Sequence, residues 1–173
     1  SLPVLVCANL PYYITSPIVM TLLESRLPID SLTVMVQKEA AQRLCARPGT
    51  REAGAVTLAV QYYAVPEILF SVSRGSFLPA PHVDSAVIRL TLRKEPPCPV
   101  RDETVLFRAV RAAFGQRRKT LLNSLSSGGW SRDAVSAALD KAGISPTARA
   151  EELTLEDFAR LSENLPDPAS MRP

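Results

Sequence analysis

The chain has 173 residues, of which 46% are hydrophobic and 21% charged, and its formal net charge is +3. This composition fits one ordinary domain or two small ones and excludes a wholly disordered chain. No apolar run reaches the roughly 20 residues needed to cross a bilayer, and no signal-peptide pattern is present, so we expect no membrane partner. Three widely spaced cysteines and one histidine predict neither a metal site nor a disulfide framework, which favours a reduced, cytoplasmic compartment.

Residues 1–97 alternate between predicted strands and helices. Strands are predicted at Val4–Ala8, Leu32–Gln37, Ile68–Val72 and Ser85–Leu92, and helices at Ser16–Glu24, Lys38–Ala46 and Ala55–Ala64. The second strand is almost continuously apolar, as expected when helices cover both faces of a sheet. The last strand alternates, which is typical of a strand at a sheet edge or buried on one face. This order predicts an α/β sheet with right-handed crossovers.

The pattern changes after a stiff linker, Glu95-Pro96-Pro97-Cys98-Pro99. Helical periods follow at Val105–Phe114, Lys119–Leu125, Arg132–Ala142 and Leu155–Leu161. We therefore predict an α/β part over residues 1–97 and a small all-helical domain over residues 98–173. The chain opens on Ser1 almost directly before a buried-looking strand, so we also expect the N-terminal part of the sheet to lie outside this sequence.

The first strand ends in an unusual corner, Asn9-Leu10-Pro11-Tyr12. Ligands of open α/β sheets bind beyond the carboxyl ends of the strands. An asparagine oxygen and a nearby backbone carbonyl are both acceptors, and an aromatic ring beside them can stack on a base that has been turned out of its helix. These four residues therefore fit a grip on an exocyclic amino group, or else a structural turn with Tyr12 and Tyr13 packed in the core.

A second stretch, Ser76 to Ser85, holds two prolines that stiffen an extended loop directly after Phe77. The ring of Phe77 could lie against the other face of a base, or it could be a hydrophobic plug that closes the loop. We assign His82 no role, and for Asp84 we expect capping or turn formation rather than service as a general base.

The positive charge is concentrated in residues 101–119, which hold six Lys or Arg against two Asp or Glu. Three consecutive basic residues at a predicted helix start oppose the helix dipole, so helix stability does not explain them. A nucleic-acid phosphate backbone does explain them, and a solvated charged face is the alternative.

Five stretches, in order, resemble the ribosomal RNA adenine dimethyltransferase family: NLPYYITSP, QKEAAQRL, SFLPAPHVDSAVIRL, AFGQRRKTLLNSL and RAEELTLEDFARL. The doubled tyrosine and QRRKTLLNSL are most similar to the bacterial small-subunit branch (the KsgA type). The resemblance implies the C-terminal portion of such an enzyme. Its fold would be the C-terminal half of a Rossmann-like methyltransferase sheet, with parallel strands and an antiparallel last strand, followed by a helical rRNA-binding domain.

The family uses S-adenosylmethionine to dimethylate the N6 atoms of two adjacent adenines near the 3′ end of 16S rRNA during ribosome biogenesis. The resemblance thus implies a monomeric enzyme acting on small-subunit rRNA in the pre-30S particle. Asn9 and the Leu10 carbonyl would accept from the amino group, and Asn9 would also line the methyl end of the cofactor. Pro11 would stiffen the corner, and Tyr12 and Phe77 would face the two sides of the adenine. The residues that would contact rRNA phosphates are Arg108, Arg111, Arg117, Arg118 and Lys119.

The family's glycine-rich cofactor turn and its ribose-binding acidic residue precede the NLPY corner, and neither occurs in this sequence. We therefore expect the chain by itself to be inactive and to bind S-adenosylmethionine weakly. Two other functions stay open at this point. One is a non-catalytic rRNA-binding module for ribosome assembly, and the other is a helical interaction domain on an α/β scaffold.

Overall fold

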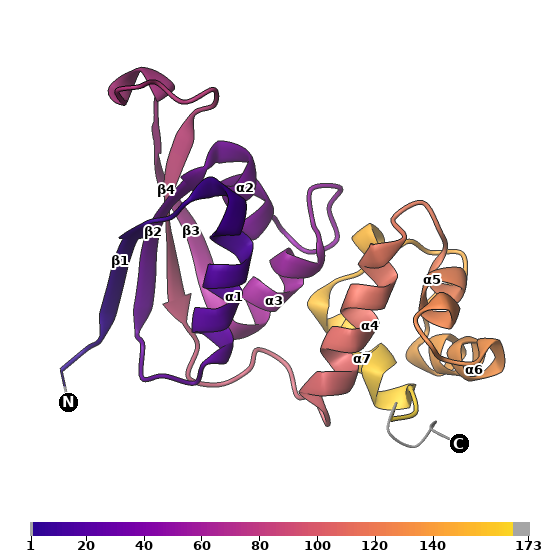
Figure 1. The fold of residues 1–173 in the computed structure, drawn as a ribbon. Helices are drawn as coiled ribbons and strands as arrows, with labels where there is room; N and C mark the ends of the chain where they lie inside the picture. The colour runs from indigo at the N-terminus through magenta and orange to yellow at the C-terminus, as the bar shows by residue number, and fades with distance from the viewer. Residues whose placement is uncertain (1, 168–173) are drawn as a thin grey trace. The chain divides into compact units, whose positions relative to one another are not determined.

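The computed structural model describes residues 2–167 (Figure 1). Its four strands are β1 (Leu5–Asn9), β2 (Ser31–Gln37), β3 (Ala64–Val72) and β4 (Ser85–Leu92). The helices among them are α1 (Thr15–Glu24), α2 (Lys38–Leu44) and α3 (Ala55–Tyr63), with short 3₁₀ turns η1 (Tyr12–Ile14) and η2 (Arg74–Ser76). The elements that follow the sheet are α4 (Glu103–Gly115), α5 (Leu121–Ser127), α6 (Arg132–Ala142), η3 (Ala150–Glu152) and α7 (Leu155–Asn164).

The sheet is mixed, with strand order β1-β2-β4-β3. β1 and β2 are parallel, and β4 runs antiparallel to both of its neighbours. The predicted mixture of parallel strands with an antiparallel last strand is therefore confirmed. The register places Asn9 opposite Met35 and Gln37 opposite Ser85. The carboxyl ends of β1 and β2 and the start of β4 thus lie together at the same end of the sheet.

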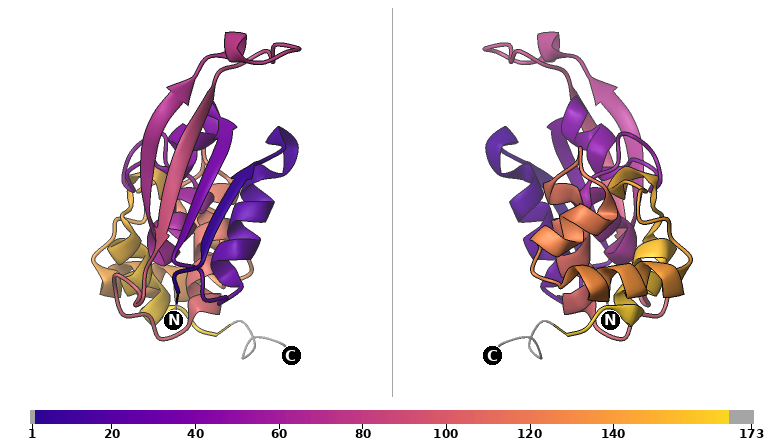
Figure 2. Two further views of the ribbon diagram at one scale, coloured as in Figure 1. Left: turned by 90° about the vertical axis from the view of Figure 1, so that its left-hand side faces the viewer. Right: turned by 90° about the vertical axis from the view of Figure 1, so that its right-hand side faces the viewer.

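The core of the sheet lies on one face. Leu32, Val34 and Val36 of β2 are buried together with Ile88 and Leu90 of β4. α1 and α2 lie on this face, whereas Figure 2 shows the strands open to view from the other side. The apolar side chains exposed on the strands are Leu5, Val65, Ile68 and Phe70. The predicted cover of helices on both faces is therefore not found among residues 2–167, and β4 is buried on one face, inside the sheet rather than at its edge.

Two element boundaries differ from the sequence prediction for identifiable reasons. β3 begins at Ala64 rather than Ile68 and includes Pro66. A proline argues against a strand because it lacks the ladder donor, but β3 pairs only with β4 among the described strands, and an edge strand tolerates it. The helix predicted from Lys119 begins only at Leu121. The basic residues before it therefore lie in a turn, and the argument from the helix dipole does not apply to them.

The chain divides into two compact units. We call residues 1–47 and 59–96 the sheet unit, and residues 48–58 and 97–173 the helical unit. The sequence places a boundary after residue 97 but gives no sign that residues 48–58 associate with the later helices. The first turn of α3 belongs to the helical unit and the rest of α3 to the sheet unit.

The helices of the helical unit share an apolar core, and α4 and α6 begin with side-chain caps. Asp102 caps α4 by accepting from the Thr104 N–H at 2.7 Å, and Ser131 caps α6 by accepting from the Ala134 N–H at 3.2 Å. Such caps satisfy backbone donors that the first helical turn leaves unpaired. The largest fully buried side chains of this unit are Leu58, Leu106, Leu121, Leu125, Leu139, Phe158, Leu161 and Leu165.

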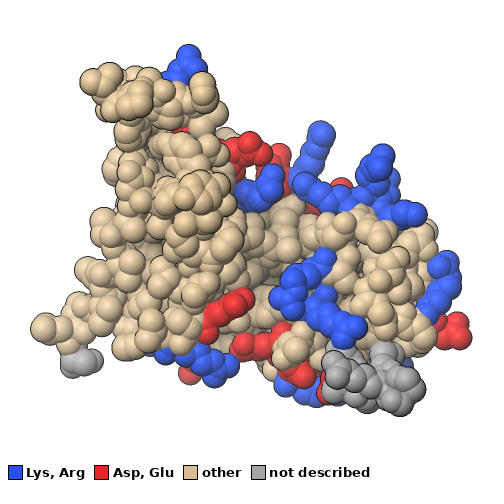
Figure 3. Space-filling view, viewed as in Figure 1, with Lys and Arg blue, Asp and Glu red and all other residues tan. Residues whose placement is uncertain are grey.

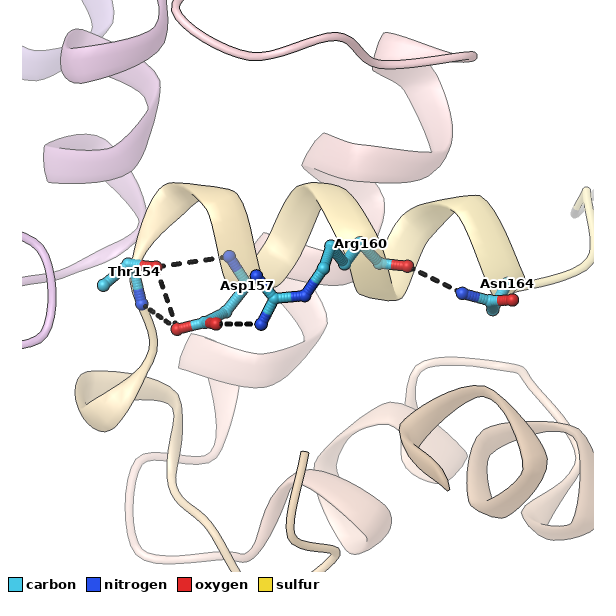
Figure 4. A network of polar contacts seen from close by, with 4 residues as sticks. All are labelled: Thr154, Asp157, Arg160 and Asn164. Carbon is cyan, nitrogen blue, oxygen red and sulfur yellow. Dashed lines mark hydrogen bonds and ion pairs between the residues drawn. The ribbon is translucent and has the colours of Figure 1, made fainter. Parts of the chain in front are cut away.

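α7 begins with a reciprocal capping box, drawn in Figure 4. The Asp157 carboxylate accepts from the Thr154 N–H at 2.9 Å, and the Thr154 hydroxyl accepts from the Asp157 N–H at 3.2 Å. Arg160 adds an ion pair to the same carboxylate. Partial burial alone would raise the pKa of Asp157, but these hydrogen bonds and the Arg160 charge outweigh it and hold the pKa below its ordinary value.

Candidate functional site

The corner at the end of β1 is held by hydrogen bonds to its neighbours. The Leu10 N–H donates to the Met35 carbonyl at 3.1 Å, which continues the pairing with β2 by one residue. The Pro11 carbonyl accepts from the Ile14 N–H at 3.3 Å and from the Thr15 hydroxyl at 3.2 Å. Because Pro11 fixes one backbone angle and its carbonyl is bonded twice, the chain turns from strand to helix in a single defined way.

The two tyrosines of the corner have different environments. Tyr13 is 86% exposed, whereas Tyr12 is half-buried and its hydroxyl lies 2.7 Å from the Ser85 hydroxyl at the start of β4. Ser85 is fully buried. The alternative in which both rings pack in the core is therefore wrong. Sequence reasoning did not identify Ser85, and only the strand register that brings it to the corner could have done so.

The five residues predicted to form the target-base site, Asn9, Leu10, Pro11, Tyr12 and Phe77, all line one pocket. This pocket has a volume of about 370 Å³ and is formed by Asn9, Leu10, Pro11, Tyr12, Phe77, Pro79 and Pro81. We call it the corner pocket. Residues 9–12 come from the end of β1, and the others come from the connection between β3 and β4. Two stretches about seventy residues apart in sequence thus provide an aromatic ring each and a set of polar backbone and amide groups to one cavity.

Asp84 closes the β3–β4 connection. Its carboxylate accepts from the Arg74 N–H at 2.9 Å, and its backbone carbonyl accepts from the Lys38 N–H at 3.0 Å. The Arg74 side chain in turn donates to the His82 carbonyl at 3.3 Å. Asp84 does not line the corner pocket, so turn formation, as expected from sequence, accounts for it.

The five basic residues predicted to contact phosphate fall into two groups. Those of the first donate to backbone carbonyls of this chain, and those of the second are exposed. Arg108 belongs to the first group. It is half-buried, donates to the Gly128 carbonyl at 3.2 Å, and its guanidinium lies 4.9 Å from the centre of the Trp130 ring. A side chain at Gly129, whose φ is +104°, would come within 2.7 Å of Arg108. Arg108 therefore holds the turn between α5 and α6, an intramolecular role that sequence reasoning missed.

Arg117 also makes intramolecular contacts. Its guanidinium donates to the carbonyls of Arg51 and Ala53 at 2.9 and 3.2 Å, which ties the turn after α4 to residues 48–58 of the same unit. The other three basic residues, Arg111, Arg118 and Lys119, are exposed. Figure 3 shows Lys and Arg side chains gathered over the connection between α4 and α5. The basic segment is thus partly structural and partly presented to solvent.

Other kinds of site receive no support from residues 2–167. No group of three or more His, Cys, Asp or Glu side chains in that range could hold a metal ion, and no helix there is long and apolar enough to span a membrane. The three cysteines are free thiols. Burial raises the pKa of Cys45 to about 11, so this thiol stays protonated at neutral pH.

Known proteins include relatives of this chain. A family model described as ribosomal RNA adenine dimethylase matches residues 2–167. The chain is 53% identical over 165 residues to ribosomal RNA small subunit methyltransferase A of Geobacillus thermodenitrificans, which covers 93% of this chain and 56% of the relative. It is 50% identical to the protein of the same name from Lachnoclostridium phytofermentans, covering 93% of this chain and 57% of the relative. The chain thus spans a little over half the length of these curated relatives.

Two solved structures share the fold. One is the 23S rRNA methyltransferase ErmE, with a TM-score of 0.68, 31% identity and coverage of 94% of this chain and 65% of that one. The other is a dimethyladenosine transferase from Plasmodium falciparum, with a TM-score of 0.76, 24% identity and coverage of 93% and 66%, a likeness of fold alone. With a family model matched from residue 2 to residue 167, the chain belongs to the ribosomal RNA adenine dimethylase family.

Proposed function

We propose that this chain supplies the target-base grip and the rRNA-binding helices of an enzyme that dimethylates N6 of two adjacent adenines near the 3′ end of 16S rRNA. The corner pocket carries the proposal, because it brings Asn9, Leu10, Tyr12 and Phe77 together in a chain of this family. The relatives at about 50% identity are named as small-subunit enzymes, which favours small-subunit rRNA in a pre-30S particle as the partner.

The polar side of the corner pocket suits an adenine amino group. The Asn9 amide oxygen and the Leu10 carbonyl accept its two hydrogens, which leaves the nitrogen lone pair directed away from both acceptors. Pro11 keeps these acceptors at a fixed spacing. The increase in methylation rate comes mainly from positioning the amino group. A misplacement of about 1 Å in such a site can lower the rate about 100-fold.

The aromatic side of the pocket holds the ring of the base. Tyr12 stacks on one face and Phe77 lies against the other, so the base is held after it leaves its helix. Stacking of this kind contributes about 1–3 kcal/mol per base. The hydrogen bond between the Ser85 and Tyr12 hydroxyls holds one ring in position before the base arrives.

The cofactor fits this chain only at one end. S-adenosylmethionine supplies an electrophilic methyl group on sulfur, and Asn9, at the carboxyl end of β1, would line that end. The 173 residues contain no glycine-rich turn between a strand and a helix that could hold the rest of it. The role of the chain's own residues is therefore to bind and orient the adenine, and no side chain must act as a strong base, because the methylated ammonium group loses its proton to water. We infer that this chain alone does not transfer methyl groups.

The helical unit supplies the contacts to the RNA backbone. Arg111, Arg118 and Lys119 are exposed and would contact phosphates directly. Arg108 and Arg117, which are hydrogen-bonded within the unit, would contribute mainly by fixing the surface from which the others project. Binding of this kind weakens as the salt concentration rises.

Asn9→Ala in the full-length gene product tests the proposal. We expect dimethyladenosine formation in unmethylated small subunits to fall at least about 100-fold, while RNA binding stays within about twofold of wild type. Asn164→Ala, which removes an exposed amide at the end of α7, is the matched control and should leave both unchanged. Methylation by Asn9→Ala at the wild-type rate would refute the assigned role of the corner pocket.

A further inference from the structure

A second, larger pocket lies in the sheet unit, and nothing in the proposed function uses it. Its volume is about 510 Å³, within the range of ligand sites. We call it the polar pocket. It is formed by the end of β2, the start of α2 and the two ends of the β3–β4 connection, through Gln37, Lys38, Glu39, Gln42, Arg74, His82, Val83 and Asp84.

The β3–β4 connection contributes residues to both the polar pocket and the corner pocket. Phe77, Pro79 and Pro81 of the β3–β4 connection line the corner pocket, and the residues directly after them, beginning with His82, line the polar pocket. On the strand side, Asn9 pairs with Met35, and Gln37 stands two residues further along β2. With ordinary strand spacings, the backbones at Asn9 and Gln37 are about 8 Å apart. The nucleotide backbone of one RNA strand can span that separation.

Two cationic side chains in the polar pocket can bind an anionic group. Lys38 and Arg74 supply positive charge. Two carboxylates also line the pocket. The Glu39 carboxylate lies 3.4 Å from the Arg43 guanidinium, and the Asp84 carboxylate accepts from the Arg74 backbone N–H. The Arg74 guanidinium uses one of its five N–H donors in the bond to the His82 carbonyl. A phosphate would therefore be bound by Lys38 and by the other N–H donors of Arg74, in a lining that also holds two carboxylates.

The remaining polar groups suit the edge of a base. Gln37 and Gln42 line the pocket, and each amide offers both donors and acceptors. Base edges of single-stranded RNA are read by such groups, and their phosphates are bound by Lys and Arg. Phosphate-binding and base-reading groups thus occur together, one nucleotide step from the corner pocket.

We propose that the polar pocket binds the nucleotide next to the target adenine in the same RNA strand. Lys38 and Arg74 contact the phosphate that joins the two nucleotides, and Gln37 and Gln42 contact the edge of the neighbouring base. This inference rests on the proposed function, because it assumes that the corner pocket holds the target base. In the proposed arrangement, the β3–β4 connection lies between two consecutive nucleotides of the RNA.

The test compares adenosine with the dinucleotide ApA in NMR titrations of the full-length gene product. Adenosine should shift the signals of Asn9, Tyr12 and Phe77 only, whereas ApA should also shift those of Lys38 and Gln42 and bind about tenfold more tightly. Lys38→Gln should lower ApA affinity roughly three- to tenfold and leave adenosine binding unchanged. Lys94→Gln, which removes an exposed charge beyond the other end of β4, should change neither.

The outcomes separate the two proposals. Equal affinity for adenosine and ApA, with no shifts at Lys38 and Gln42, would overturn the neighbouring-nucleotide site and leave the target-base site intact. Equal losses of ApA affinity in Lys38→Gln and Lys94→Gln would overturn it as well, since the tighter binding of ApA would then come from general electrostatic attraction. Inorganic phosphate that shifts the polar pocket as fully as ApA does would show a simple anion site. Adenosine that leaves Asn9, Tyr12 and Phe77 unshifted would instead overturn the proposed function.

Discussion

The hydrogen bond between Tyr12 and Ser85 can be removed from either side, since Ser85→Ala deletes one hydroxyl and Tyr12→Phe the other. The two oxygens lie 2.7 Å apart, and Ser85 is fully buried, so solvent does not readily replace the lost partner at that position. A bond of this kind contributes on the order of 1 kcal/mol. Each change should therefore lower the free energy of unfolding by about that amount and shift the ratio of correctly placed to displaced rings about fivefold.

A double-mutant cycle measures whether the two hydroxyls act together. Urea unfolding of the two single variants and the double variant should give a coupling energy of about 1 kcal/mol. In methylation assays of the full-length gene product, both single variants should lower kcat by up to about fivefold, with KM little changed, because the ring is still present to stack. Tyr12→Ala should cost more, by the 1–3 kcal/mol of a lost stacking contact.

Ser71→Ala is the matched control, because it removes an exposed serine hydroxyl from neighbouring β3 and should change neither stability nor rate. Two results would refute the reasoning. Strictly additive effects of Ser85→Ala and Tyr12→Phe would mean that the hydrogen bond is not the link between them. A loss of stability in Ser85→Ala with an unchanged kcat would mean that Ser85 supports the sheet without positioning the ring.

Three further predictions concern the helical unit. Arg117→Gln should lower the thermal stability of the unit, because it removes the bonds to two backbone carbonyls. Arg118→Gln should leave the melting temperature unchanged. It should reduce the slope of the logarithm of the rRNA-binding constant against the logarithm of salt concentration by about one. Equal melting temperatures in Arg117→Gln and Arg118→Gln would contradict this division of roles. Asp157→Ala should cost about 1 kcal/mol at pH 7 through loss of the capping box. Because the folded pKa of Asp157 lies below its ordinary value, that contribution is complete above about pH 5 and declines as the pH falls through the folded pKa. A difference between wild type and Asp157→Ala that stayed constant down to pH 2 in unfolding curves would exclude this assignment. Gly129→Ala should destabilise the protein by roughly 1–3 kcal/mol, since φ at this position is +104° and the new methyl group would displace a guanidinium; an unchanged melting temperature would contradict it.

The sequence predicts the order and type of the elements well, because each has a local cause. Apolar runs, alternation and helical periods are properties of a few neighbouring residues. The corner pocket was also predictable in its residues, since Asn9 to Tyr12 and Phe77 carry unusual chemistry in stiff surroundings. The predicted start of β3 was wrong because the rule against proline in strands has an exception that depends on position in the sheet. Pro66 lies in an edge strand, which tolerates it.

Contacts between distant residues were beyond the reach of the sequence. Nothing near Ser85 indicates that it bonds to Tyr12, seventy-three residues away. Arg108 and Arg117 look like members of a uniform basic cluster, and only tertiary structure shows that both donate to backbone carbonyls. Charge counts cannot separate a cation that holds the fold from one that faces solvent.

The contacts of Arg117 also bear on how this protein can be dissected. A cut at the proline-rich linker would separate its guanidinium from the carbonyls of Arg51 and Ala53, because the helical unit is discontinuous in sequence. A helical fragment that starts at residue 97 would therefore lack part of its own structure. Exchanging the RNA-binding helices between two relatives would need two grafts, one of residues 97–173 and one of the short loop at 48–58, which a sequence alignment would assign to the other half.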